Sequence, residues 1–126
     1  MSEVLARKRD PPGKIHRERW REAKRFQRRV QSALVGLRVS FSEWLVLSTI
    51  DELGLEHGEN VSQNLVAERT GLTRVTAGHW ARVLERKGLV DRGEHYNLRA
   101  WGVVLTQEGA STLERCNERL AFVAGD

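Results

Sequence analysis

The spacing of apolar residues along the chain predicts a mainly helical protein with a small β hairpin. Residues 14–38 and 106–124 carry apolar side chains every three or four positions in otherwise polar sequence, as expected of helices with a narrow apolar stripe. Between residues 44 and 53 apolar side chains occupy most of the helical circumference. This segment is therefore predicted to be the buried central helix of the domain.

Polar residues mark where several of these helices begin. Ser40 and Glu43 have the spacing of a capping box, ahead of the apolar run of the central helix. Ser62 is expected to cap a short helix, and Thr106 is expected to cap the last one. Val61 is predicted to pair as a short strand just before Ser62.

Residues 61–92 follow the pattern of a helix-turn-helix. Gly71 supplies the backbone freedom that a tight interhelical turn requires. In the second helix, from Thr73 to Lys87, one face is apolar and is predicted to pack inward: Ala77, Trp80, Ala81 and Leu84. The opposite face is predicted to be free for contact with a partner: Arg74, Val75, Gly78, His79 and Arg82.

A β hairpin is predicted directly after this second helix. Gly88 ends the helix and residues 89–92 begin the first strand. Residues 93–97 are predicted to form a polar tip, and residues 98–105 the returning strand.

The narrow apolar stripes on the first and last helices each need a partner surface. The first stripe consists of Ala23, Phe26, Val30, Ala33 and Leu37. The second consists of Leu113, Cys116, Leu120 and Val123. In a chain of 126 residues that partner is expected to be a second subunit, so both stripes are predicted to form a homodimer interface.

Positive charge is concentrated at the N-terminus. Residues 1–38 carry 12 Lys and Arg against 4 Asp and Glu, whereas the remainder carries 9 against 13. Such a block favours a polyanionic partner, most simply nucleic acid, although a solvated helix face explains the charge equally well. Residues 1–13 are predicted to be a disordered basic arm, which either follows DNA or is an ordinary frayed tail.

The sequence argues against several other classes of protein. A single cysteine excludes an internal disulfide, and the four histidines lack the spacing of a zinc site. No phosphate-binding loop, nucleophile motif or paired carboxylate cluster is visible, so we expect neither an enzyme nor a cofactor. No apolar run is long enough to cross a bilayer, and we expect a cytoplasmic protein without a membrane partner.

Residues 61–92 also resemble the MarR family of winged helix-turn-helix transcription regulators. The positions that match the family pattern are Ser62, Val66, Ala67, Gly71, Leu72, Thr76, Leu84, Glu85, Gly88, Leu89, Val90 and Arg92. A second segment, 97–100 followed by 104–109, is similar to the family's wing. The resemblance implies a single winged-helix domain over residues 14–126, with an N-terminal helix (14–38), a winged-helix core (40–105) and a C-terminal helix (106–124), the two outer helices serving dimerisation.

The resemblance also implies a DNA-binding surface. Its expected residues are Ser62, Gln63, Thr73, Arg74, Val75, Thr76, Gly78, His79, Arg82, Arg92 and Arg99. Arg99 is expected near the minor groove, and Arg82 and Arg92 on phosphates together with Ser62 and Gln63. The chain departs from the family at Gly78 and His79. Gly78 is explained either by close approach of the helix to DNA or as a tolerated exposed glycine.

The function expected from these features is a sequence-specific regulator, most simply a repressor, that binds a pseudo-palindromic site as a homodimer. Two alternatives remain open, a winged-helix module that binds another protein and a non-specific architectural or mobile-element DNA-binding protein. The resemblance leaves room for a small aromatic effector, with Trp20, His16 and Trp44 as candidate contacts. Cys116 is interpreted as a buried, inert cysteine rather than a redox sensor.

Overall fold

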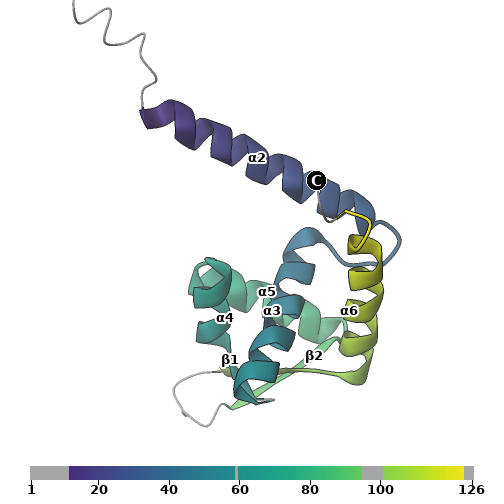
Figure 1. Cartoon of the computed structure of the whole chain (residues 1–126). Helices are drawn as coiled ribbons and strands as arrows, with labels where there is room; N and C mark the ends of the chain where they lie inside the picture. Colours follow the sequence, from purple (N-terminus) through teal and green to yellow (C-terminus); the bar gives the residue numbers. More distant parts are fainter. Residues whose placement is uncertain (1–11, 59, 95–100, 124–126) are drawn as a thin grey trace, which may run out of the picture.

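The computed structural model describes residues 12–58, 60–94 and 101–123, and confirms a mainly helical fold with a small β wing (Figure 1). Its helices are α2 (Pro12–Ala33), α3 (Phe41–His57), α4 (Gln63–Thr70), α5 (Arg74–Arg86) and α6 (Gln107–Leu120). Its strands are β1 (Val61–Ser62), β2 (Val90–Glu94) and β3 (Trp101–Leu105).

Helix α2 projects away from the remaining elements, and its C-terminal end meets α6 and α3 (Figure 1). It begins at Pro12, earlier than predicted, because proline is tolerated in the first turn of a helix. It ends at Ala33 rather than at residue 38, since Gly36 adopts a φ of 89° that cannot continue a helix. With 22 residues the helix is about 33 Å long, so much of it lies outside the lobe.

Helix α3 is the buried centre of the lobe, as predicted. Its apolar residues Val46, Leu47, Ile50 and Leu53 are at most 2% exposed, and the helix contacts α4, α5, α6 and β3. The predicted capping box is confirmed. Ser40 Oγ accepts from the Glu43 amide at 3.2 Å, and Glu43 Oε1 accepts from the Ser40 amide at 3.2 Å.

The three strands form an antiparallel sheet in the order β1-β3-β2. The predicted pairing of Val61 is confirmed, with Val103 as its partner. Gly93 and Glu94 were expected in the tip of the hairpin, and this was wrong: both belong to β2, opposite Gly102 and Trp101. The remaining predicted tip, Arg99 and the first part of the returning strand lie outside the described residues.

The start of α6 is locked to the end of α5. Thr106 caps α6 as predicted, since its Oγ1 accepts from the Gly109 amide at 3.0 Å. The same hydroxyl donates to the carbonyl of Gly88 at 2.7 Å. Gly109 lies so close to Leu89 that a Cβ atom there would be 1.9 Å from the Leu89 carbonyl oxygen. Only glycine permits this approach of the two segments.

The two apolar stripes are partly internal, which corrects the prediction that they form a dimer interface. Val30, Leu113 and Cys116 are at most 4% exposed within a single chain and belong to its core. Leu37 and Leu120 pack partly against the same core, joined by Leu34. The stripes do meet each other, but within one subunit, because the C-terminal end of α2 lies against α6.

Other apolar side chains of α2 remain outside that core. Ile15 is 52% exposed, and Ala23 is also exposed. Phe26 is 45% exposed and its ring lies edge-on to Phe41, with a centroid distance of 6.3 Å. Together with Trp20, which is 63% exposed, these side chains give α2 an apolar surface that the single chain leaves uncovered.

Candidate nucleic-acid interface

Helix α5 turns its predicted outward face to solvent. Thr73 occupies the N-cap position and its Oγ1 accepts from the Thr76 amide at 3.1 Å. Arg74, Val75 and His79 are exposed, Val75 by 80%. On the inward face Ala77, Ala81 and Leu84 are at most 1% exposed, and Trp80 packs partly against the core. The division of α5 into a packed face and a free face is therefore confirmed, except at Gly78.

Gly78 does not lie on the free face, which corrects both sequence-based explanations of it. The residue is buried, and a Cβ atom there would be 3.0 Å from Nε2 of Gln63. The neighbouring group is thus the first side chain of α4, within the same chain. The spacing along α5 could not reveal this contact, because Gln63 lies on another helix.

Arg92 also differs from its predicted role as a phosphate contact. Its side chain is only 9% exposed, with Nη1 3.4 Å from Glu85 Oε1. Its Nε donates to Oε1 of Gln63 at 3.3 Å, and its guanidinium lies 4.7 Å from the centroid of the Trp101 ring. These contacts join β2 to α4, α5 and β3, and they leave little of the arginine accessible to a ligand.

Ser62 occupies the N-cap position of α4, but its side chain makes no capping hydrogen bond to the helix. The prediction of a side-chain cap was therefore wrong. The residue pairs with Gly102 as part of β1, and its extended backbone carries the chain from the sheet into α4. The sheet, rather than the serine hydroxyl, fixes where this helix starts.

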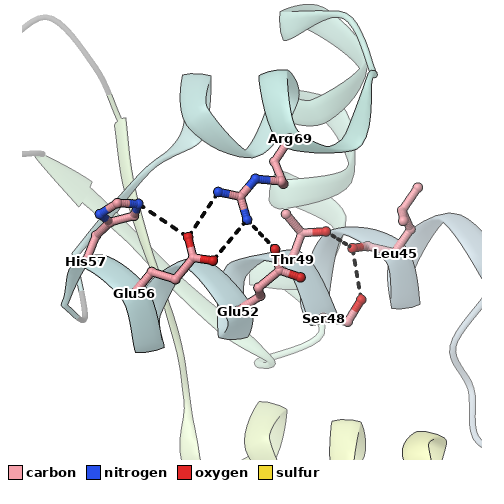
Figure 2. A network of polar contacts seen from close by, with 7 residues as sticks. All are labelled: Leu45, Ser48, Thr49, Glu52, Glu56, His57 and Arg69. Carbon is pink, nitrogen blue, oxygen red and sulfur yellow. Dashed lines mark hydrogen bonds and ion pairs between the residues drawn. The ribbon is translucent and has the colours of Figure 1, made fainter.

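An ionic group that the sequence analysis missed joins α4 to α3 (Figure 2). Arg69 on α4 pairs with Glu52 and with Glu56 of α3, the second at 3.0 Å. The Arg69 guanidinium lowers the pKa of Glu56, and the two carboxylates raise the pKa of Arg69. Two glutamates four residues apart on one helix face were the available signal, but their partner lies in a separate element.

A second ionic contact holds the C-terminal end of α5. Lys87 Nζ pairs with the buried carboxylate of Glu43 and donates to the carbonyl oxygen of Arg38 at 2.8 Å. Glu43 therefore serves both the capping box of α3 and the anchoring of α5. Arg38 itself has a φ of 61°, in the left-handed region.

The candidate effector residues do not share one environment. His16 and Trp20 are exposed on α2, with Lys24 Nζ 5.5 Å from the Trp20 ring. Trp44 packs within the lobe against Phe41, at a centroid distance of 5.6 Å. Cys116 is fully buried, and burial raises the pKa of its thiol. The effector contacts remain a prediction.

Membrane-spanning helices and clusters of metal-ligating side chains are both absent from the described residues. No helix among them combines the length and apolar character needed to span a bilayer. No three or more His, Cys, Asp or Glu side chains of this part of the chain gather as metal ligands would.

A helix-turn-helix followed by an antiparallel wing, with the second helix presenting a free face, defines a winged helix-turn-helix protein. Comparison with solved structures places this fold with MarR-family transcriptional regulators, so the resemblance drawn from the sequence is confirmed at the level of fold. No protein-family model and no curated protein matches the sequence.

Three of the similar structures illustrate the range of the likeness. A MarR-family transcriptional regulator from Rhodococcus sp. RHA1 is 25% identical with a TM-score of 0.78, covering 93% of this chain and 80% of its own. CouR from Rhodococcus jostii RHA1, solved with p-coumaroyl-CoA, is 26% identical with a TM-score of 0.73, and the match covers 92% of this chain and 76% of CouR. A mutant MarR from E. coli, solved with operator DNA, is 20% identical with a TM-score of 0.74, and the match covers 84% of this chain and 73% of the MarR chain.

Proposed function

We propose that this protein is a DNA-binding transcription regulator whose helix α5 enters the major groove. The observation that carries the proposal is the free face of α5, which is braced on its other sides by the core and exposes Val75 by 80%. An apolar side chain so exposed on a rigid helix suits contact with a thymine methyl group. Regulators of the same fold have been solved with DNA.

The residues of α5 divide between bases and phosphates in this proposal. Arg74, Val75 and His79 are exposed near the N-terminal end of the helix, where recognition helices contact base edges. Thr73 and Thr76 are already linked by a hydrogen bond of 2.9 Å and lie at the same end. Arg82, one turn further, is assigned to a phosphate. Arg99 remains a candidate for the minor groove.

We further propose that the protein acts as a homodimer on a pseudo-palindromic site, most simply as a repressor. The exposed apolar residues of α2, Ile15 and Phe26, support a partner along that helix. Two-fold symmetry would then place the half-sites about 10 base pairs apart, one turn of the double helix.

A second candidate function is non-specific DNA binding through α2. This helix carries a row of basic residues along its length: Arg17, Arg21, Lys24, Arg25, Arg28 and Arg29. Contacts from such a row would act on phosphates of any sequence and would depend strongly on salt. A third candidate function is that of a module that binds another protein through the same exposed surfaces and does not bind DNA.

Selection of bound duplexes from a random pool distinguishes these functions. A sequence-specific regulator should enrich a pseudo-palindrome and prefer it over random duplex by about 10³-fold or more. An architectural protein should bind with a steep salt dependence but enrich no sequence. A protein-binding module should retain no duplex, which would contradict both DNA-binding functions.

A further inference from the structure

Trp101 is an exposed indole on the side of the wing that faces the helices. Residues directly opposite each other in an antiparallel pair, and residues two apart on one strand, lie on the same face of a sheet. Trp101 and Val103 of β3 therefore share a face with Arg92 of β2, which pairs with Val103. Val103 is 1% exposed in the core, whereas Trp101 is 53% exposed. The lobe thus covers one end of this face and leaves the indole uncovered.

The indole is nevertheless held in place from behind. The guanidinium of Arg92 lies 4.7 Å from the centroid of the Trp101 ring. The same group donates to Oε1 of Gln63 at 3.3 Å and lies 3.4 Å from Oε1 of Glu85, with its side chain only 9% exposed. Contacts with α4 and α5 therefore fix the arginine on which the ring rests. A ring held in this way loses little conformational freedom when it binds a partner.

The surface between Trp101 and α5 continues to an exposed cation. Gln63, which accepts the hydrogen bond from Arg92, also lies against Gly78 of α5. Nη1 of Arg82 is 3.6 Å from the position of a Cβ atom on Gly78, and Arg82 is exposed. An exposed guanidinium and an exposed aromatic ring therefore lie on one surface that runs from α5 to the wing.

We propose that Trp101 packs against a deoxyribose of bound duplex DNA, next to a phosphate contacted by Arg82. With α5 in the major groove and the wing at the minor groove, the strand that separates the two grooves must run over this surface. Its backbone alternates anionic phosphates with sugars whose carbon atoms are apolar, which suit an arginine and an indole respectively. The inference rests on the proposed DNA-binding function. It adds a contact, because the resemblance to the family's wing covers residues 97–100 and 104–109 and assigns no role to Trp101.

The substitution Trp101→Ala tests the sugar contact. Affinity should fall about ten-fold for the selected duplex and by the same factor for random duplex, because a sugar carries no sequence information. The slope of log affinity against log salt concentration should stay unchanged, whereas Arg82→Ala should reduce it by about one. A changed specificity ratio or a reduced salt slope in Trp101→Ala would overturn the inference.

Leu55→Ala is the control for removing an exposed apolar side chain. Leu55 is 83% exposed on α3, between Glu52 and Glu56, whose negative charge disfavours contact with a duplex. This variant should bind as the wild type does, and both variants should keep thermal midpoints near that of the wild type. Equal losses of affinity in the two variants would overturn the inference. A wild-type protein that retains no duplex would instead overturn the proposed function, and this inference with it.

Tryptophan fluorescence gives a readout that a purely structural role of Trp101 would not produce. Binding of the selected duplex should change the emission of the wild type. Trp101→Phe keeps a ring over Arg92 and should still bind DNA, but should lose most of this change. Trp20→Phe should retain it, since Trp20 lies on the projecting helix α2 (Figure 1). A DNA-induced change in Trp101→Phe as large as that of the wild type would contradict the proposal.

Discussion

Gly109 shows how a single residue positions the wing relative to α6. The absence of a side chain lets α6 begin against the carbonyl group of Leu89, while Thr106 links the same helix to Gly88. The chain thereby joins the end of α5, the start of β2 and the start of α6 at one point. A side chain at residue 109 would push these three segments apart.

Gly109→Ala is expected to destabilise the fold by about 2–3 kcal/mol, as overpacking against backbone does, although alanine is the better helix former. The added methyl group would meet the Leu89 carbonyl oxygen at 1.9 Å, and backbone cannot move aside as a flexible side chain can. Chemical denaturation measures the change. Gly93→Ala is the control, because no heavy atom of the described residues lies within 4 Å of its Cβ position, and an equal loss there would contradict the explanation.

At the scale of elements, α4 is the short helix that must hold α5 in place. It has 8 residues, and its ionic link to α3 through Arg69 supplements the burial of Val66 and Ala67 (Figure 2). Arg69 and Glu56 are exposed, so solvent screens the pair and its contribution to stability is small. The link should nevertheless depend on pH, because it requires an ionised carboxylate.

Arg69→Gln should lower the thermal midpoint slightly at neutral pH. Because Arg69 lowers the pKa of Glu56 below its ordinary value of 4.5, the stabilisation is present above that value and is lost as pH falls through the lowered pKa. The difference in midpoint between wild type and variant should therefore shrink below about pH 4. A difference that persists unchanged in acid would show that the loss arises from packing instead.

Helix α2 is the other element on which the proposed function depends. The sequence predicted an intersubunit stripe, and burial in one chain removes Val30 from it but leaves Ala23 and Phe26 exposed. Ile15, which was not part of the predicted stripe, is exposed as well. A prediction of which residues cover the stripe needed the packing of α2 against α6, two helices that lie far apart in the sequence.

Ile15→Glu combined with Ala23→Glu should convert a dimer to monomers without unfolding the chain, since both side chains are exposed in the single subunit. Sedimentation equilibrium measures the association state. Val75→Glu is the control, because it also places a negative charge on an exposed apolar position, here of α5, and should leave the dimer intact. A double variant that remains dimeric would exclude this face of α2 as the interface.

Local patterns in the sequence were sufficient to predict the helices, their caps at Ser40 and Thr106, and most of the two faces of α5. These features depend on residues within one or two helical turns. Arg92, Gly78 and Arg69 were misassigned or missed, since each is defined by a partner on another element. Helix periodicity predicts which face of a helix is polar, but it does not predict which polar side chains on that face are covered by another segment of the chain.

At the scale of the whole molecule, contacts from several elements hold α5 in a fixed position. The core packs its inner face, Lys87 anchors its end to Glu43, and Arg92 connects it to the wing through Glu85. A helix held at so many points keeps a fixed outward surface, which is what readout of base edges requires. The proposed function therefore requires that this surface be the part of the molecule that contacts DNA.

The most direct test is the specificity ratio, the affinity for the selected duplex divided by that for random duplex, measured at one salt concentration. For the combined substitution Arg74→Ala and His79→Ala, the account predicts a fall in this ratio of at least about ten-fold, because each lost base contact removes discrimination of about 1–3 kcal/mol. The thermal midpoint should stay near that of the wild type, since both side chains are exposed. An unchanged ratio in this folded variant would contradict the proposal that α5 reads the DNA sequence.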